Sequence, residues 1–318
     1  MANTVIMVWK KHHDSGFGDL LRGTIYLYNL SQKFKFNLKV DMQLHPVSKY
    51  LIAPPHQYSD YVLQNESKII NGINTDPKWI EGLIRTGQRS PNPVLITTNY
   101  SENCNNSPSP ECKRFMRNLL IPNSDFKSYI FTMCHEFKLV PNYSILHFRL
   151  GDDDLLHAIA NLQLHEELLQ VIDANMTPNA YIMTDSLLFK NYLKQVRPHL
   201  AGRITPTTPI HLAHSTENDI ASIKETLFDF MLLSNAKLIK THSVYGWISG
   251  FVHWVSVIHN IPLINMKQPL KSSMKQRIMS PAAPKPIVTH AHNPIVAFMN
   301  SIHSSPRPAI NLAFNKMF

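Results

Sequence analysis

Short apolar segments alternate with longer segments of helical spacing along most of the chain, which predicts strands separated by helices. At the start, Val5 to Trp9 is a predicted strand, Leu20 to Lys33 a predicted helix, and Phe36 to Asp41 a second strand. A glycine-containing loop at residues 14–19 joins the first strand to the helix. This strand–loop–helix–strand unit is typical of a doubly wound α/β layer.

The same alternation resumes beyond residues 138–143, where we expect a boundary between two domains. Further strands are predicted at Ser144 to Phe148, Ala180 to Thr184, Lys237 to Lys240 and Pro262 to Asn265, with a short segment at 203–204. Helices are predicted around Leu155 to Asn175, Leu187 to Val196, Asp219 to Ser234 and Trp247 to Ile258. A parallel sheet with crossover helices is the simplest arrangement of these elements.

Other regions differ in composition. Residues 45–60 and 86–112 are rich in Pro, Asn and Ser and are expected to be long loops, whereas Met116 to Phe137 is expected to be partly helical. Residues 266–318 are rich in Pro, Ser, His and Lys, which indicates an extended tail, with a short helix near 294–302 that returns to the N-terminal domain. We therefore expect two α/β domains, residues 1–140 and 141–265, followed by this tail.

The composition fits a folded protein without a membrane span. The 318 residues are 44% hydrophobic and 17% charged, enough for a sizeable core. No apolar run approaches the ~20 residues that cross a bilayer, and the N-terminus lacks a signal-peptide cleavage pattern. Cys104, Cys112 and Cys134 cannot all pair and do not have the spacing of metal ligands. We expect a cytoplasmic protein in a reducing compartment.

The net charge is +9 and the isoelectric point is near 9.4, so the surface attracts phosphate groups. The basic residues are scattered, as in KFKFNLK and CKRFMR, and no predicted helix carries a basic stripe. We therefore expect one anion-binding cleft rather than a surface for DNA or RNA.

The strongest candidate site is the segment HFRLGDDD, which begins at the end of the predicted strand 144–148. Ligands of open α/β sheets bind outside the carboxyl ends of the strands. His147 and Arg149 are two residues apart on a strand, so they face the same side. The guanidinium of Arg149 is suited to grip a diphosphate with two hydrogen bonds and to stabilise charge that develops on it.

The aspartates Asp152, Asp153 and Asp154 allow a different interpretation of the same segment, as a metal site. They contain an Asp-x-Asp pattern, which in some glycosyltransferases holds a divalent ion against a nucleotide diphosphate through hard oxygen ligands. A third reading has no ligand at all, because acidic residues also favour the N-terminus of a helix. The residues alone leave these readings open.

The segment GFGDLLRG, residues 16–23, follows the first predicted strand. Gly16 and Gly18 let the backbone approach a ligand closely, Asp19 is placed to cap the helix, and Arg22 can reach back to an anion. The segment lacks the Gly-Lys-Ser/Thr of a phosphate-binding loop and the third glycine of the dinucleotide fingerprint. A turn with a cap explains it equally well.

Two more predicted strands end in polar residues. One ends at Thr184 and Asp185, and the other at Thr241-His242-Ser243, where the amides of the turn open the next helix. Asp229 lies on an otherwise apolar helix, where a carboxylate needs a partner or a function. A capped contact between helices is the alternative without a ligand.

These four segments, in their order along the chain, resemble the motifs of the fucosyltransferase superfamily, whose members have two Rossmann-like domains in the GT-B architecture. It includes the α1,6-, nodulation-factor, α1,2- and protein O-fucosyltransferases. The motif His-x-Arg-x-Gly/Thr-Asp matches His147, Arg149, Gly151 and Asp152. The other matches are the glycine loop with its helix and strand, the pair Thr184-Asp185, and the set Asp229, Ser234, Thr241 and Ser243. The resemblance covers most of 14–42 and 144–265.

The resemblance implies inverting transfer of fucose from GDP-fucose to a hydroxyl of a glycan or glycoprotein, without metal or other cofactor. The N-terminal domain would take the acceptor and the C-terminal domain the nucleotide sugar. Arg149 would bind the β-phosphate, His147 and Asp229 the guanosine, and Ser243 with its neighbouring amides the phosphates. The other donor-site residues would be Gly16, Gly18, Asp19 and Arg22 from the N-terminal loop and Asp185, Thr241 and His242 at the strand ends.

The sequence also departs from this family. Leu150 stands where the family commonly has a second arginine, and His157 where α1,6-type enzymes have a glutamate. Another nucleotide sugar, such as a UDP- or GDP-linked pentose like xylose or another deoxysugar, is the alternative donor. A non-catalytic protein that binds a nucleotide or glycan is the alternative from another class.

An inverting transfer needs a base that accepts the acceptor's proton. Asp154 is favoured because it lies close to the arginine, and His157 because it stands where related enzymes have a glutamate; Asp14 and Asp19 in the N-terminal loop are the other candidates. Asp152 matches a family position that often holds the arginine loop, so it is set aside. Arg149, Asp154 and His157 are thus the predicted catalytic residues.

Overall fold

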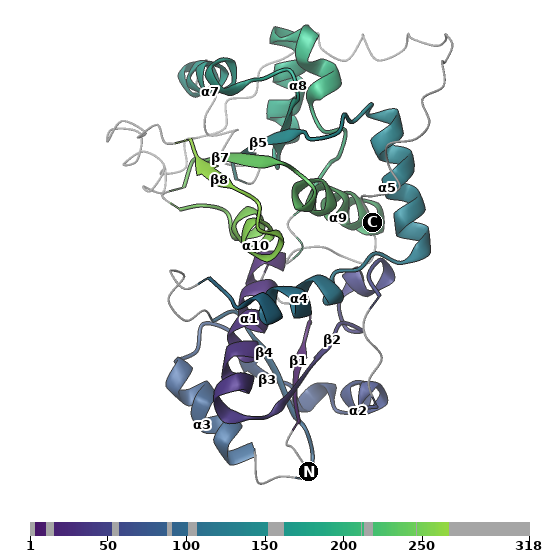
Figure 1. The fold of residues 1–318 in the computed structure, drawn as a ribbon, viewed down its shortest axis with the longest axis vertical. Coiled ribbons are helices and arrows are strands. Elements are labelled where there is room, and N and C mark those ends of the chain that lie inside the picture. Colours follow the sequence, from purple (N-terminus) through teal and green to yellow (C-terminus); the bar gives the residue numbers. More distant parts are fainter. Residues whose placement is uncertain are drawn as a thin grey trace, which may run out of the picture. The chain divides into compact units, whose positions relative to one another are not determined.

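The computed structural model describes residues 4–10, 16–52, 57–87, 91–100, 107–151, 162–210, 212, 219–245 and 247–266, without the side chains of 162–164 (Figure 1). These residues form two parallel sheets with helices between the strands. Both sheets lie in one compact unit, Met1–Lys267. The expected α/β class is therefore confirmed.

The first sheet has the strand order β2-β1-β4-β3, and all its neighbours are parallel. Its strands are β1 (Thr4–Val8), β2 (Asn37–Asp41), β3 (Ile70–Gly72) and β4 (Val94–Thr98). The accompanying helices are α1 (Phe17–Phe34), α2 (Ser59–Gln64), α3 (Pro77–Gly87), α4 (Pro110–Leu119) and α5 (Ser124–Glu136), with short 3₁₀ turns at Pro46–Lys49 and Glu66–Lys68. Every residue of β1 is buried, as expected for a central parallel strand with both faces covered.

The second sheet has the order β6-β5-β7-β8 and is also parallel. Its strands are β5 (Ser144–Arg149), β6 (Ala180–Thr184), β7 (Leu238–Ser243) and β8 (Leu263–Asn265). Its helices are α7 (Leu162–Asn175), α8 (Leu187–Val196), α9 (Ile220–Ser234) and α10 (Gly250–His259), with a 3₁₀ helix at Pro198–Arg203. Ile204 adds a parallel bridge to Ile182, so the chain after the 3₁₀ helix runs along the outer edge of β6.

The register of the second sheet brings three strand ends together. Phe148 of β5 is paired with Thr184 of β6, and Arg149 is paired with Ser243 of β7. The carboxyl ends of β6, β5 and β7 therefore lie next to one another in that order. Side chains that follow these strands share one edge of the sheet.

Helix α10 connects β7 to β8 but packs against α1 and α4, which accompany the first sheet. Phe17 at the start of α1 meets Phe230 of α9 edge-on, with ring centres 5.1 Å apart. Arg117 of α4 donates a 2.8 Å hydrogen bond to the carbonyl of Ile258. Gly18 lies so near the backbone of Gly250 that a Cβ on Gly18 would come within 2.6 Å of the Gly250 carbonyl carbon. The first turns of α1 and α10 are therefore in direct backbone contact.

Most predicted elements of the second sheet are found, and β6 and α8 have the predicted bounds. The prediction of a long loop over 86–112 is wrong, because it contains β4 and the start of α4. The five residues of β4 lie between polar segments, so a prediction from the average composition of the region overlooked them. They form a strand because they pair with β1 and β3. Likewise, 45–60 contains a 3₁₀ turn and the start of α2. The predicted helix start near Leu155 and the tail after Met266 lie outside the described residues.

Among the described residues, no helix is both long and apolar enough to span a membrane.

Candidate functional site

A cavity of about 970 Å³ lies at the carboxyl ends of the second sheet. Its walls come from both halves of the compact unit, the half that contains the first sheet and the half that contains the second. They are the start of α1, the ends of β5 and β6, helix α9, and the loop that leads into α10. The predicted site residues that line it are Gly16, Gly18, Asp19, Arg22, His147, Arg149, Asp185 and Asp229. The fold thus brings together residues from four separate segments of the sequence.

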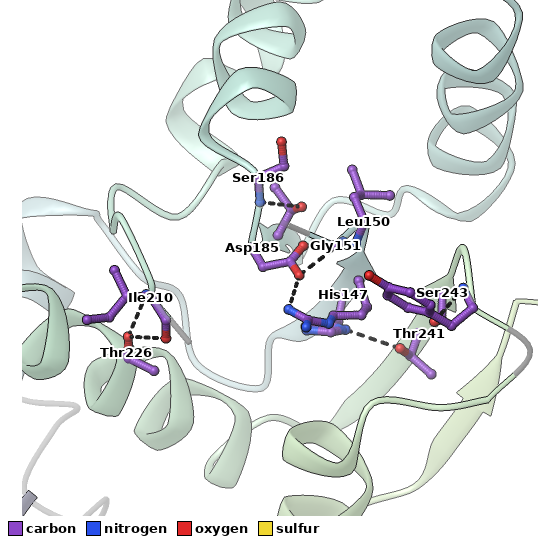
Figure 2. Close-up of polar contacts among 12 residues, drawn as sticks. His147, Leu150, Gly151, Asp185, Ser186, Ile210, Thr226, Thr241 and Ser243 are labelled. Carbon is purple, nitrogen blue, oxygen red and sulfur yellow. Dashed lines mark hydrogen bonds and ion pairs between the residues drawn. The ribbon is translucent and has the colours of Figure 1, made fainter. Parts of the chain in front are cut away.

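Arg149 is held in place by Asp185. The two side chains form an ion pair, and the same carboxylate accepts hydrogen bonds from the backbone amides of Leu150 at 2.9 Å and Gly151 at 3.3 Å (Figure 2). Gly151 has a φ of 88°, a conformation that favours glycine. Burial raises the pKa of Asp185, while Arg149 and the two amides oppose that shift. The aspartate therefore orients the guanidinium and the loop after it.

His147 precedes Arg149 on the same face of β5 and is buried. Its Nδ1 lies 3.2 Å from the hydroxyl of Thr241 on the neighbouring strand, a contact drawn in Figure 2. Burial, and secondarily the charge of Arg149, lower the pKa of His147 to about 3. The imidazole is therefore neutral at pH 7, so it acts as a hydrogen-bonding group rather than a cation.

Asp229 forms the other end of the site, on α9. Its side chain is only 2% exposed, and the hydroxyl of Thr207 lies 2.9 and 3.0 Å from its two oxygens. Behind Thr207 lies the ammonium of Lys190, which is also buried and donates to the hydroxyls of Thr205 at 3.2 Å and Thr207 at 3.1 Å. Burial raises the pKa of Asp229 to about 6, although Lys190 and the Thr207 hydrogen bond oppose this.

Lys190 was not identified from the sequence. It lies in the segment LLFKNYLKQV of α8, where a lysine resembles the solvent-exposed positions around it. A usable signal was its place between Phe189 and Leu193 on the buried face. We define Lys190, Thr207 and Asp229 as the buried relay, because each side chain contacts the next.

The N-terminal wall is built by the first turns of α1. The amide of Gly16 donates to one oxygen of Asp19 at 3.0 Å, and Arg22 donates to the other at 2.7 Å. Asp19 therefore caps α1 and orients Arg22, while the buried Nε of Arg22 has no hydrogen-bond partner among the described residues. The helices α1 and α10 both begin at the cavity, so their partial positive ends face it.

The predicted donor-site residues Thr241, His242 and Ser243 are not among the residues that line the cavity. Thr241 contacts His147 as above, and Nδ1 of His242 lies 3.1 Å from the carbonyl of Met266. The hydroxyl of Ser243 accepts a 3.2 Å hydrogen bond from the amide of Tyr245. These residues shape the strand end and the turn after it.

That turn carries two lining residues that sequence reasoning missed, Tyr245 and Trp247. The guanidinium carbon of Arg149 lies 5.9 Å from the centre of the Tyr245 ring. The rings of Tyr245 and Trp247 are stacked, with centres 5.3 Å apart and planes 24° from parallel. Two aromatic residues directly after a strand end, in the segment SVYGW, were the available signal.

The predicted catalytic bases Asp154 and His157 lie outside the described residues, as do Asp14, Asp152 and Asp153. In the part of the chain that the structure describes, no group of three or more His, Cys, Asp or Glu side chains is placed to hold a metal ion. The positive groups at the cavity are instead Arg149, Arg22 and the two helix starts. This arrangement is suited to an extended anion with a hydrogen-bonding group at one end.

Comparison with known proteins gives a structural likeness only. No family model and no curated protein matches the chain. The fucosyltransferase NodZ from Bradyrhizobium aligns over 83% of this chain and 96% of its own, with 14% identity and a TM-score of 0.50. NodZ α1,6-fucosyltransferase soaked with GDP-fucose gives 16% identity, 83% and 95% coverage, and a TM-score of 0.51. POFUT1 in complex with GDP gives 10% identity, 83% and 98% coverage, and 0.45. The chain has the GT-B fold, as the likeness to the two NodZ structures shows.

Proposed function

We propose that this protein is a glycosyltransferase that moves a sugar, most simply fucose from GDP-fucose, to a hydroxyl of a glycan, with inversion and without a metal ion. The observation that carries the proposal is Arg149, fixed by Asp185 at the strand ends of a cavity that two helix starts also face. The GT-B fold shared with NodZ supports it.

The diphosphate of the donor binds between Arg149 and the first turns of α1 and α10. When the bond between the anomeric carbon and the diphosphate oxygen breaks, negative charge grows on the leaving phosphate. A guanidinium already held in position stabilises that charge without reorganising. Arg22, on the wall that α1 contributes, supplies a second positive charge, which compensates for the leucine at position 150.

The nucleoside binds at the end of the cavity where Asp229 lies. A guanine base presents two adjacent N–H donors, N1–H and N2–H, whereas uracil presents a single ring N–H. The two oxygens of one carboxylate accept the guanine pair, which favours a GDP-linked donor over a UDP-linked one. His147, held neutral, adds a hydrogen-bonding group to the same cavity.

The acceptor hydroxyl attacks the anomeric carbon from the side opposite the diphosphate, which inverts its configuration. Asp154 and His157 remain our proposed bases for the proton of this hydroxyl. Both oxygens of Asp19 already accept hydrogen bonds within α1, which makes Asp19 the weaker choice. A rate that falls below about pH 6.5 in the wild type, but not in His157→Ala, would assign the histidine.

Calorimetric titration tests the donor. We expect the full chain to bind GDP and GDP-fucose more tightly than UDP, and Arg149→Ala to weaken GDP binding roughly ten- to a hundredfold. Transfer or donor hydrolysis in Arg149→Ala should fall about 10²- to 10³-fold, with partial recovery in Arg149→Lys. Arg203→Ala is the matched control, because Arg203 lies on the 3₁₀ helix after α8 and does not line the cavity.

Tight binding of UDP-sugars without a response to GDP would overturn the fucose assignment. GDP binding without transfer or hydrolysis of any nucleotide sugar would instead favour a non-catalytic binding protein. Full turnover in a folded Arg149→Ala variant would remove the central claim of the mechanism.

A further inference from the structure

Trp247 presents a large apolar surface to the solvent. It is 67% exposed, the highest value among the large hydrophobic side chains that the structure describes. It also lines the cavity, so this exposed indole belongs to the wall of a concave site and not to a convex surface. An exposed tryptophan inside a cavity is a typical anchor for a ligand, because its large rigid ring gives much contact area at low cost in conformational entropy.

The indole is the outer end of a stacked series of side chains. Trp247 stacks on Tyr245 at 5.3 Å, and Tyr245 in turn contacts the guanidinium of Arg149, 5.9 Å from its ring centre. We define Tyr245 and Trp247 as the aromatic platform. It leads outward from the residue that binds the diphosphate in our proposal.

The strand order shows on which side of Arg149 the platform lies. Asp229 is hydrogen bonded to Thr207, which follows the bridge of Ile204 on the outer edge of β6. The platform follows β7, on the other side of β5. In Figure 2, Ile210 and Thr226 accordingly lie on one side of Asp185 and His147, while Thr241 and Ser243 lie on the other. From the Ile204 edge to β7 there are three strand spacings, or about 14 Å.

This order fixes the direction of a bound nucleotide sugar. With its base at Asp229 and its diphosphate at Arg149, the sugar end points toward the β7 side. The acceptor binds next to the anomeric carbon, beyond the sugar in that direction. The aromatic platform therefore lies where the acceptor must bind, and away from the end of the cavity where the guanine base binds.

We propose that the aromatic platform binds a pyranose ring of the acceptor glycan by stacking, with Trp247 as its main contact. The inference rests on the proposed function. One face of a pyranose carries several C–H groups with slight positive charge, and these pack well on the negative face of an aromatic ring. The hydroxyls at the rim stay free for hydrogen bonds or for attack on the donor. The platform thus specifies a saccharide acceptor rather than a peptide.

The test combines GDP calorimetry with a glycan array. The full chain, saturated with GDP, is applied to an array of immobilised mammalian, plant and bacterial oligosaccharides. We expect the wild type to bind a subset of them and Trp247→Ala to lose at least about tenfold in apparent affinity for that subset. Trp247→Phe, which keeps a flat ring, should retain most of the binding.

Trp79→Ala is the matched control, since Trp79 is an exposed tryptophan on α3 that does not line the cavity, and it should bind glycans as the wild type does. GDP affinity should be the same in all four proteins. The inference would be overturned if the wild type bound no saccharide, or if Trp247→Ala bound saccharides as the wild type does. If Trp247→Ala lost GDP affinity but bound glycans normally, the aromatic platform would hold the guanine base instead of the acceptor. This result would also overturn the inference. Failure of GDP to bind the wild type would refute the proposed donor site separately.

Discussion

The carboxylate of Asp185 holds Arg149 in two ways, through the guanidinium itself and through the backbone amides of the next two residues. The side chains of the pair are 23% and 18% exposed, so water competes only partly with the interaction. Since β6 ends at Thr184 beside Phe148, the aspartate reaches the arginine from the neighbouring strand. The position of the guanidinium is thus set before any ligand arrives.

Asp185→Asn should separate this role from simple folding. The amide oxygen can still accept from a backbone N–H, but the charge that holds the guanidinium is gone. We expect a loss of about 1–3 kcal/mol in the free energy of unfolding and a larger relative loss in GDP binding and turnover. Urea unfolding and GDP calorimetry measure the two effects. A folded Asp185→Asn protein with normal GDP affinity and turnover would show that Arg149 needs no such support.

The pKa of Asp229, raised to about 6 by burial, predicts opposite pH dependences for binding and stability. In the proposed complex the ionised carboxylate accepts the N–H groups of guanine, so GDP affinity should be constant above about pH 7 and fall as the pH falls through 6. In the unfolded chain the pKa is about 4, so between pH 4 and 6 the folded state binds the proton more tightly. Asp229 therefore lowers the free energy of unfolding above pH 6. This unfavourable contribution disappears as the pH falls from 6 to 4.

Asp229→Asn should flatten the GDP binding profile and remove this group's contribution to the stability profile, whereas Asp173→Asn, at an exposed ion pair with Arg197 outside the cavity, should leave both profiles as in the wild type. Calorimetry with GDP and urea unfolding at several pH values provide the data. Identical GDP profiles for the wild type and Asp229→Asn would remove Asp229 from the site.

Lys190→Met tests the buried relay. Lys190 opposes the rise in the pKa of Asp229, so its removal should raise that pKa further and move the midpoint of the GDP binding profile to higher pH. Loss of the buried charge and its hydrogen bonds should also change stability, which urea unfolding reports independently. Lys194→Met, at an exposed position of the same helix, is the control. An unchanged midpoint in folded Lys190→Met would mean that Lys190 acts on the fold alone.

Gly18→Ala tests the contact between α1 and α10. A methyl group there would lie 2.6 Å from the carbonyl carbon of Gly250 and 2.8 Å from the amide nitrogen of Phe251, so the backbone of one helix would have to shift. We expect a destabilisation of about 1–3 kcal/mol in thermal unfolding. Gly82→Ala, in α3 with open space around it, should instead stabilise the protein by about 0.4–1 kcal/mol. Equal unfolding temperatures for both variants would contradict the close packing.

Removal of metal ions should leave transfer intact. In the proposed reaction, Arg149, Arg22 and the starts of α1 and α10, which line the cavity, supply positive charge around the leaving diphosphate. We therefore expect the rate after dialysis against EDTA to equal the untreated rate. Complete loss of activity, restored by Mn²⁺ or Mg²⁺, would revive the metal-binding reading of the Asp-x-Asp pattern.

The second sheet was largely predictable from the sequence because its strands are nearly continuous apolar runs that end in polar residues. Arg149 and Asp185 were found for the same reason, since each stands directly after such a run. Strand β4 was missed because it depends on pairing with β1 and β3, which are distant in sequence.

The buried relay was missed for a related reason. Lys190 and Thr207 are 17 residues apart, and only the path of the chain along the outer edge of β6 brings them together. Tyr245 and Trp247 carry no charge, so a search for charged groups passed over them. Their importance follows from exposure within a cavity, which is a property of the folded chain alone.

The chain passes from the first sheet to the second at residues 138–143, but the packing of apolar side chains is continuous across the two halves. Helix α10 lies between two strands of the second sheet, yet it covers α1 and α4 of the first half, and Phe17 of α1 packs on Phe230 of α9. Separating the halves would expose the apolar sides of all four helices to water. The consequence is cooperativity: the two sheets lose their packing together, so the cavity at the strand ends assembles only in the complete unit and not from halves that fold in advance.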